Sequence, residues 1–262
     1  MQETIEIERQ ANGVVAVALN RPQSHNAMTP QMITELTEAF RRLGGEEDVR
    51  LLILTGRGRS FCAGADLSSM RAAADYTFAQ NVADAGKIFD LMLALDSCPR
   101  PVLGRVNGAA IGGGVGLISC CDVVVAVERA TFAFSEARLG IVPAVISPFV
   151  LARIGAGAAR ELFLSGERFK AAQAQRIGLV HHVVADETAL DDRVAERVAQ
   201  LLQAAPGAQA AVKELIRTVA YRPKAEMRDY TSNLIARRRA SGEGREGMSA
   251  FLEKRKPAWQ ID

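Results

Sequence analysis

The chain has 262 residues and a mass of 28.1 kDa, and its 48% apolar and 24% charged residues exclude a disordered chain, a collagen-like repeat and a small disulfide scaffold. The net charge of +2 excludes a basic field over the whole chain of the kind that holds nucleic acid. Charge is nevertheless uneven, because residues 205–262 carry 12 Lys and Arg against 7 Asp and Glu. An anion-binding end and a solvated helical face both remain open as interpretations of this basic segment.

Three strands are predicted near the start of the chain. Residues 4–9 and 14–19 flank Asn12-Gly13, which is a strong hairpin signal. Residues 49–55 form a β-rich apolar run that is typical of a buried strand. We therefore expect the first two strands to pair as a hairpin and the third to lie inside a sheet.

A helix is predicted between the second and third strands. Thr29 can act as its N-cap, and Pro30 occupies the first helical position, where a fixed φ is tolerated. Gly44-Gly45 is predicted to end this helix. Its apolar residues form one amphipathic stripe, made of Met32, Ile33, Leu36, Ala39, Phe40 and Leu43.

The alternation of strand and helix then repeats. Residues 77–97 have a helical pattern and 101–107 a strand pattern. The glycine run 112–114 leads into a further helical segment, and 122–128 is another apolar strand. Strand–helix alternation of this kind predicts an α/β fold with crossover connections.

Strand signals stop at about Asp186. Long stretches rich in Ala, Leu and Arg follow at 187–204, 207–220, 224–240 and 243–255. We therefore predict an α/β core over residues 1–200 and a helical region over residues 201–262.

Neither a metal site nor a membrane segment is expected. The amino-terminal residues have no leader pattern, and no run approaches the ~18 apolar residues of a membrane span. This pattern predicts a cytoplasmic protein. The thiols are predicted to be buried core residues. Metal-ligand spacing is absent from the cysteines and histidines, which are Cys62, Cys98, Cys120, Cys121, His25, His181 and His182.

Two glycine-rich segments each follow a predicted strand. Residues 59–67 follow the strand at 49–55, and residues 107–116 follow the strand at 101–107. Small residues let a ligand approach the backbone, and the first N–H groups of a helix have no partner within it. Two such helix starts facing each other would direct two amides at one oxygen, as in an oxyanion hole. The alternative is that Gly and Ala simply permit tight packing, and the residues alone leave both interpretations open.

Other glycine patterns point to no site. Gly242, Gly244 and Gly247 have dinucleotide-motif spacing, but they follow a charged helical run where that motif requires a strand. The sequence contains no Walker A motif and no Gly-x-Ser-x-Gly elbow.

With these segments, the sequence resembles the crotonase family, the enoyl-CoA hydratase/isomerase superfamily, over essentially its whole length. Each motif is modest alone, but their order and spacing together are highly specific. The motifs are Leu19-Asn-Arg-Pro, Ser60-Phe-Cys-Ala-Gly-Ala-Asp-Leu, Val106-Asn-Gly…Gly-Gly-Gly, Cys121-Asp122, Phe134-Ser-Glu-Ala-Arg-Leu-Gly-Ile and Glu246-Gly-Met-Ser-Ala-Phe-Leu-Glu-Lys-Arg.

The resemblance implies a fold and a class of ligand. The fold would be a crotonase-like spiral of ββα units with a C-terminal helical region that makes homo-trimers, often paired into hexamers. The substrate would be an acyl-CoA thioester whose carbonyl lies between the backbone N–H groups of Ala65 and Gly113. Coenzyme A is then part of the substrate, so no separate cofactor is expected, and neither is a nucleic-acid or membrane partner.

The resemblance also assigns residues to CoA binding. Arg21 and His25 would lie near the phosphates or adenine, and Phe251 and Lys254 would help hold the CoA of a neighbouring subunit. The last pair gives the basic C-terminal end a candidate ligand. The path of the adenine and pantetheine would be lined by Ala63, Asp66 and Leu67, and Gly64 and Gly112 would also bind the substrate or its CoA.

Only one of the two catalytic carboxylates that the resemblance implies is present. Family hydratases flank the substrate with two glutamates, of which Glu136 corresponds to the second and Gly116 occupies the position of the first. Glu136 would carry the proton at Cα, and an apolar pocket would raise its pKa. The departure at Gly116 puts a two-glutamate hydratase mechanism in doubt.

The subclass therefore has alternatives. Residues 143–150 and the C-terminal Phe-Leu-Glu-Lys-Arg-Lys-Pro-Ala-Trp resemble the methylglutaconyl-CoA hydratase branch, which also lacks the first glutamate. We therefore expect a hydratase for a branched or glutaconyl-type enoyl-CoA. A lone Glu136 also fits a Δ3,Δ2-enoyl-CoA isomerase. A non-catalytic CoA-binding or RNA-binding homologue is a third possibility, against which the retention of Glu136 argues.

Overall fold

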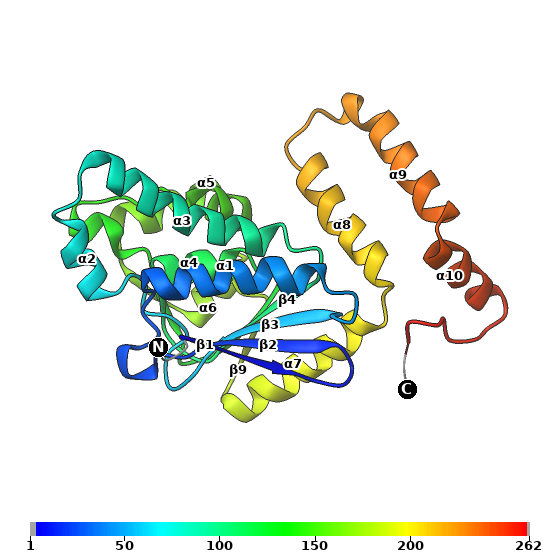
Figure 1. Ribbon diagram of the computed structural model, residues 1–262, viewed down its shortest axis with the longest axis horizontal. Coiled ribbons are helices and arrows are strands. Elements are labelled where there is room, and N and C mark those ends of the chain that lie inside the picture. Colours follow the sequence, from blue (N-terminus) through cyan, green and yellow to red (C-terminus); the bar gives the residue numbers. More distant parts are fainter. Residues whose placement is uncertain (1–3, 261–262) are drawn as a thin grey trace.

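The computed structural model describes residues 4–260 (Figure 1). Residues 1–3 and 261–262, which belong to the predicted core and helical region, lie outside the described residues. The largest sheet has the strand order β1-β2-β3-β4-β6-β9, with β1 antiparallel to β2 and every other pair parallel. Its strands are β1 (Ile5–Arg9), β2 (Val14–Leu19), β3 (Leu51–Gly56), β4 (Val102–Val106), β6 (Val123–Val127) and β9 (His182–Val184).

A second, smaller sheet contains β5 (Ala110–Ile111), β7 (Thr131–Ala133) and β8 (Arg168–Lys170) in the order β5-β7-β8. Two successive units share one pattern: β4 joins the large sheet and β5 the small one before a helix follows, and β6 and β7 do the same. The predicted α/β spiral of ββα units is thereby confirmed.

Helices cover the large sheet on both faces (Figure 1). On one face lie α1 (Pro30–Gly45), α3 (Phe78–Asp96) and α4 (Gly113–Ser119), and on the other lies α7 (Glu187–Leu202). Every residue of β3 is buried, as expected of a central parallel strand. The remaining helices of the core are α2 (Leu67–Ala73), α5 (Ser147–Ser165), which is kinked at Gly155, and α6 (Ala171–Arg176).

Helix α1 follows its prediction at both ends. Thr29 Oγ1 accepts a hydrogen bond from the Met32 N–H at 3.2 Å, and the whole predicted apolar stripe is buried. The helix ends at Gly45, within the predicted Gly44-Gly45 pair, and Glu46 is the C-cap. A Cβ on Gly44 would stand 3.1 Å from Cys98 Sγ, so this glycine also permits close packing.

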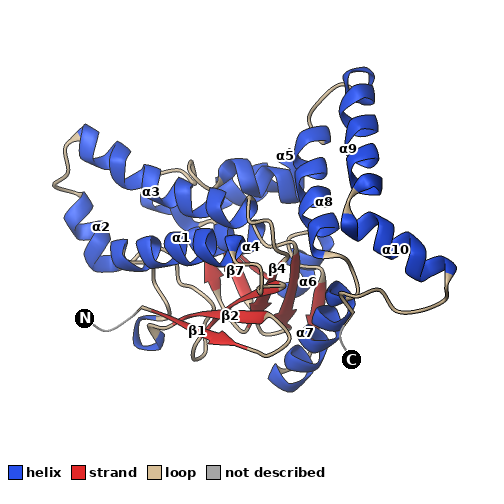
Figure 2. Ribbon diagram, turned by 45° about the vertical axis from the view of Figure 1, so that its right-hand side comes forward, coloured by secondary structure: helices blue, strands red, loops and turns tan. Residues whose placement is uncertain are grey.

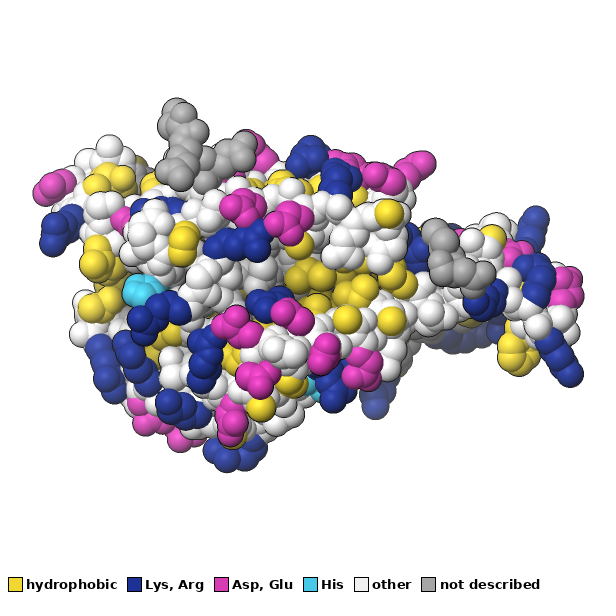
Figure 3. All heavy atoms as spheres, turned by 90° about the horizontal axis from the view of Figure 1, so that it is seen from below, with side chains coloured by type: hydrophobic (Ala, Val, Ile, Leu, Met, Phe, Trp, Pro, Cys, Tyr) yellow, Lys and Arg dark blue, Asp and Glu magenta, His cyan; other side chains and the backbone are white. Residues whose placement is uncertain are grey.

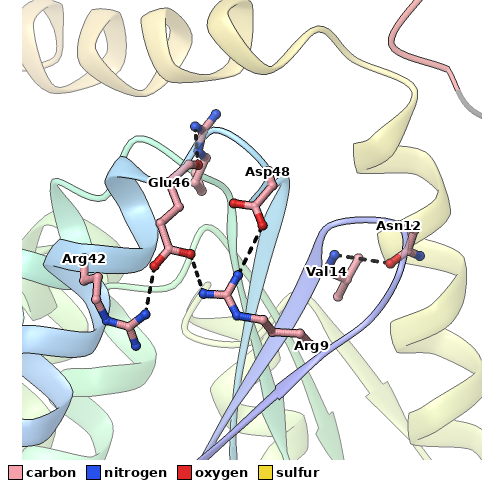
Figure 4. Close-up of polar contacts among 7 residues, drawn as sticks. Arg9, Asn12, Val14, Arg42, Glu46 and Asp48 are labelled. Carbon is pink, nitrogen blue, oxygen red and sulfur yellow. Dashed lines mark hydrogen bonds and ion pairs between the residues drawn. The ribbon is translucent and has the colours of Figure 1, made fainter.

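Ion pairs join the β1–β2 hairpin to the end of α1 (Figure 4). Arg9 contacts Glu46 and lies 3.4 Å from Asp48, while Arg42 reaches Glu46 from one helical turn earlier at 2.8 Å. In the turn of the predicted hairpin, Asn12 Oδ1 accepts the Val14 N–H at 3.2 Å. These exposed contacts fix the edge of the sheet relative to α1.

The C-terminal helices stand away from the core (Figures 1 and 2). They are α8 (Pro206–Val219), α9 (Arg228–Ala240) and α10 (Gly242–Leu252), with a short 3₁₀ turn at Lys224–Met227 before α9. Lys213 ties α8 to the core, since its Nζ lies 2.6 Å from Asp122 Oδ2 and donates to the Arg100 carbonyl at 3.1 Å. The four predicted helical stretches are confirmed, while the boundary at residues 200/201 stays a prediction.

Candidate functional site

Ala65 lies in a short stretch of backbone that pairs with Met28. The Met28 N–H donates to the Gly64 carbonyl at 2.7 Å, and the Asp66 N–H donates to the Met28 carbonyl at 3.1 Å. In a parallel bridge of this pattern the residue between the two bonded neighbours directs its own N–H to the opposite side. The Ala65 N–H is accordingly exposed and has no hydrogen-bond partner within residues 4–260.

The other edge of this stretch is held by the segment that leads into α4. The Cys62 N–H donates to the Ala109 carbonyl at 3.0 Å, and the Ile111 N–H donates to the Cys62 carbonyl at 2.9 Å. Gly64 has a φ of +91°, and a Cβ there would stand 2.9 Å from the Ile111 carbonyl oxygen. Only glycine fits this position, because a side chain would meet both strain and backbone.

The second glycine-rich segment starts helix α4. Gly112 is the N-cap, and Gly113 and Gly114 are the first helical residues, whose N–H groups have no acceptor in the preceding turn. A Cβ on Gly113 would stand 2.3 Å from Met28 Cε, and one on Gly114 would stand 2.6 Å from the Cys62 carbonyl oxygen. The helix start therefore packs directly against the Ala65 segment, and the two predicted amides are brought into one place.

Glu136 lies over the start of α4. It belongs to a 3₁₀ turn at Ser135–Leu139, and its Oε1 is 2.9 Å from the position that a Cβ on Gly112 would take. Its Oε2 is buried and has no hydrogen-bond partner among the described residues. Burial without a cationic partner raises the pKa of this carboxyl above its usual value. A carboxyl with a raised pKa is a candidate proton carrier.

An apolar wall fills the space in front of Gly116. A Cβ on Gly116 would stand 2.6 Å from Ile146 Cγ2 and 3.2 Å from Met92 Cε, and both of these side chains are buried. The position that would carry a second glutamate thus has neither a carboxylate nor room for one. Within this part of the site, Glu136 is the acid/base group that the chain supplies.

Asp66 and Arg21 form an ion pair beside Ala65. Arg21 Nη1 lies 2.9 Å from Asp66 Oδ2 and donates to the Ala27 carbonyl at 2.6 Å. Asp66 Oδ1 caps α2 by accepting the Ser68 N–H at 3.0 Å. The hydrogen bond from the Ser68 hydroxyl, together with the contacts from Arg21, lowers the pKa of Asp66 to about 2. This pair is engaged in holding the Ala65 segment, and a contact with phosphate stays a prediction for Arg21.

His25 lies on the same side of the molecule as this pair. Its ring Nδ1 is 3.0 Å from Ser60 Oγ, and its carbonyl accepts the Ala63 N–H at 3.0 Å. The structure therefore gathers most of the predicted site. The residues that it brings together are Arg21, His25, Ala63, Gly64, Ala65, Asp66, Leu67, Gly112, Gly113 and Glu136.

Phe251 and Lys254 are far from this group within one chain. Phe251 lies in α10 and is 82% exposed, and α10 is at the opposite end of the molecule from α2 (Figures 1 and 2). The prediction placed these two residues at the site of a neighbouring subunit, and one chain does not test it. The four cysteines are buried as predicted, and burial raises the pKa of Cys62 and of Cys121 to about 12.

Two grooves lie away from Glu136. One of about 880 Å³ runs between the large sheet and α7, with apolar side chains at its floor and charged ones at its rim (Figure 3). The other, about 530 Å³, is an almost wholly apolar groove between α8 and α9. None of the predicted site residues lines either groove. Within residues 4–260, no helix is long and apolar enough to cross a membrane, and no three acidic, His or Cys side chains are grouped to hold a metal.

Comparison with known proteins decides the family. The model of the enoyl-CoA hydratase/isomerase family matches residues 9–261. The chain belongs to this family. Among curated enoyl-CoA hydratase/isomerase relatives, the probable enoyl-CoA hydratase echA8 of Mycobacterium tuberculosis is 36% identical over 257 residues, which cover 97% of each chain. The probable enoyl-CoA hydratase of Rhodobacter capsulatus is 35% identical over 94% of each chain.

Solved enoyl-CoA hydratase/isomerase structures agree with the fold. An enoyl-CoA hydratase from Shewanella pealeana superimposes with a TM-score of 0.94 and 39% identity, covering 98% of this chain and 96% of its own. AtuE of Pseudomonas aeruginosa superimposes with a TM-score of 0.95 and 38% identity, covering 98% and 99%. These similarities place the chain in the crotonase superfamily over nearly its full length.

Sequence reasoning missed two residues of this enoyl-CoA hydratase/isomerase site. Met28 touches both amide-bearing segments, and Ile146 fills the space in front of Gly116. Ile146 belongs to the stretch 143–150 that the sequence marked as distinctive, but its contact with Gly116 is long-range. Met28 follows Asn26-Ala27 without any pattern of its own, and only its spatial neighbours reveal it.

Proposed function

We propose that this enoyl-CoA hydratase/isomerase family member is a hydratase, which adds water across the Cα=Cβ bond of a branched or glutaconyl-type enoyl-CoA. The observation that carries the proposal is the position of Glu136, whose carboxyl lies at Gly112, the N-cap of α4, and whose buried Oε2 has no hydrogen-bond partner among the described residues. CoA is part of the substrate in this proposal, so no separate cofactor is needed.

The two free amides suit the thioester carbonyl. Ala65 and Gly113 each present an N–H without an acceptor in the described part of the chain, and the Met28 contacts bring their segments together. When water adds at Cβ, negative charge develops on the carbonyl oxygen as an enolate forms. Fixed donors stabilise that charge, and losing one such donor typically costs ~10²–10³ in rate.

Glu136 can carry the proton through the whole reaction. As the carboxylate, it takes one proton from water while the hydroxyl oxygen bonds to Cβ and the C=C electron pair moves onto the enolate. As the carboxylic acid, it then returns that proton to Cα and the carbonyl re-forms, so the atoms of one water are added. Its raised pKa supports this role, because both protonation states must be accessible in one turnover.

Exposed apolar side chains lie in the segments that form the site. Leu67, which follows the Ala65 segment, is 73% exposed, and Val142, in the loop after Glu136, is 71% exposed. Contact of either side chain with the substrate would remove apolar surface from water. The proposal includes a homo-trimer or hexamer in which Phe251 and Lys254 contact the CoA of the adjoining subunit, and the exposure of Phe251 and the basic residues of 205–262 support that contact.

A specific observation favours a second candidate, a Δ3,Δ2-enoyl-CoA isomerase. Ile146 and Met92 leave no carboxylate opposite Glu136 to hold water. A single carboxyl suffices to move one proton between Cα and Cγ, and an apolar wall would exclude competing water. The two candidates therefore differ in whether solvent oxygen enters the product.

An activity screen separates the candidates. Purified protein is assayed with crotonyl-CoA, 3-methylglutaconyl-CoA and a 3-enoyl-CoA in water enriched in ¹⁸O. A hydratase gives labelled 3-hydroxyacyl-CoA, whereas an isomerase gives unlabelled 2-enoyl-CoA. Glu136→Gln should lower turnover at least ~10²-fold in either case, with the exposed Glu214→Gln as the matched control. Wild-type turnover in Glu136→Gln would refute the role of this carboxyl.

A further inference from the structure

We infer that Met28 is a positioning residue for the site, a spacer that sets the separation between the Ala65 and Gly113 amides. This inference rests on the proposed function, since it concerns the two N–H groups that would hold the thioester carbonyl. Met28 itself has no polar side-chain group for the reaction, and it acts through the two segments that it touches.

The backbone of Met28 determines where the Ala65 amide points. Its N–H and carbonyl hold Gly64 and Asp66 at 2.7 and 3.1 Å, which turns the Ala65 N–H outward. These two bonds belong to the main chain, so they persist when the side chain is changed. Substitution of Met28 therefore keeps the orientation of the Ala65 amide and changes only the contact of the side chain with Gly113.

The side chain of Met28 determines how closely α4 approaches. Met28 is 4% exposed, and its Cε stands 2.3 Å from the Cβ position of Gly113, closer than any side chain on residue 113 would allow. The methyl group thus lies directly against the first residue of α4. Because interiors are close-packed, removing the methyl lets the helix start and the Ala65 segment shift relative to each other.

The same contact explains why residue 113 is a glycine. Gly113 has ordinary helical geometry and no positive φ, so backbone strain does not require glycine there. The obstacle to a side chain is the buried end of the Met28 side chain, which would have to move, since Met28 supplies the two atoms that a Cβ would meet within 4 Å. A smaller residue at position 28 should therefore make alanine acceptable at position 113, which gives the inference a reciprocal test.

The first experiment measures activity and carbonyl polarisation in Met28 variants. A shift of about 1 Å in a reacting group can cost ~10²-fold in rate, so Met28→Ala should lower kcat by ~10–100-fold with little change in KM. Met28→Leu, which nearly conserves volume, should stay within about threefold of wild type. Binding of 4-(dimethylamino)cinnamoyl-CoA reports on the Ala65 and Gly113 amides, because its absorption moves to the red when donors polarise the thioester carbonyl. Met28→Ala should reduce this red shift.

Met32→Ala is the matched control. Met32 is a fully buried methionine of α1, so its truncation leaves a cavity and lowers stability, as Met28→Ala does. Met32→Ala should nevertheless leave the absorption shift of the bound thioester as in wild type. Met28→Val tests the same point if Met28→Ala does not fold, because it keeps an apolar side chain while lacking the reaching methyl.

The second experiment is the reciprocal substitution. Gly113→Ala alone should lose activity, and Met28→Ala/Gly113→Ala should recover at least about tenfold relative to Gly113→Ala, because the new methyl takes the vacated space. A wild-type absorption shift and kcat in Met28→Ala would overturn the inference, and so would a double variant no better than Gly113→Ala. Wild-type protein that neither turns over an enoyl-CoA nor shifts the chromophore would instead overturn the proposed function.

Discussion

Introducing a second carboxylate at position 116 tests how the apolar wall limits the reaction. The change is Gly116→Glu, made both alone and together with Ile146→Ala. If the missing glutamate limits hydration of an unsubstituted enoyl-CoA, a carboxylate at 116 should restore it. The structure adds that the single substitution has no room, because the new Cβ would stand 2.6 Å from Ile146 Cγ2.

The size of the obstacle follows from that distance. Carbon atoms pack at about 3.5–4.0 Å, so the overlap is about 1 Å, and overpacking of this kind costs roughly 1–3 kcal/mol. A buried carboxylate without a partner adds its own desolvation penalty. Ile146→Ala removes Cγ2, the atom at 2.6 Å, and leaves the Ile146 Cβ and Met92 Cε at 3.1 and 3.2 Å, although an Ile-to-Ala change in a core by itself costs about 2–5 kcal/mol. Both double and single variants are therefore expected to unfold at lower temperature than wild type.

The assay is hydration of crotonyl-CoA, followed by loss of the conjugated thioester absorption. Gly116→Glu should show no gain, whereas Gly116→Glu/Ile146→Ala should exceed Ile146→Ala alone by at least about tenfold, within the range expected of one acid/base group. A stable and active Gly116→Glu would refute the wall as the obstacle. A folded double variant with no gain would refute the idea that the missing carboxylate limits hydration.

Three further predictions follow from the same contacts. Burial raises the pKa of Glu136 in the folded state, so its contribution to stability is present below about pH 4.5 and is lost as the pH rises through the folded pKa. In chemical denaturation, Glu136→Gln should therefore be more stable than wild type at pH 7 but not at pH 4. A difference in stability that does not change with pH would contradict this. Gly112→Ala places a side chain at a φ of +51° and 2.9 Å from Glu136 Oε1, so it should cost about 1–3 kcal/mol of stability and lower turnover. Thermal unfolding and initial rates measure these two effects. Gly157→Ala, at a position with open space, is the control and should change neither. Lys213→Met removes the partner of Asp122 in α8 and should lower the free energy of unfolding by about 1–3 kcal/mol. Hydrogen exchange in α8 should become faster. Unchanged exchange would show that the ion pair does not hold this helix.

Local patterns predicted the elements whose stabilisation is local. The Asn12-Gly13 hairpin and the Thr29-Pro30 start of α1 are confirmed because a turn and a cap are set by neighbouring residues. The three-residue strands β7, β8 and β9 gave no comparable signal, since each owes its conformation to pairing with a distant partner. The close approach of Gly44 to Cys98 was likewise not predicted, because Cys98 lies in a distant segment of the chain.

By itself, the sequence predicted the α/β class and the two glycine-rich helix starts, which follow from residue type, order and spacing. Its motifs also resemble those of the crotonase family, and that resemblance singled out Glu136 as the candidate acid/base group. Only the tertiary structure decided that Met28 contacts both amide-bearing segments, that Ile146 occupies the space before Gly116, and that Arg21 is engaged with Asp66. The physical reason is that such contacts join segments distant in sequence, and packing against those neighbours is what fixes which side chain fills a given space.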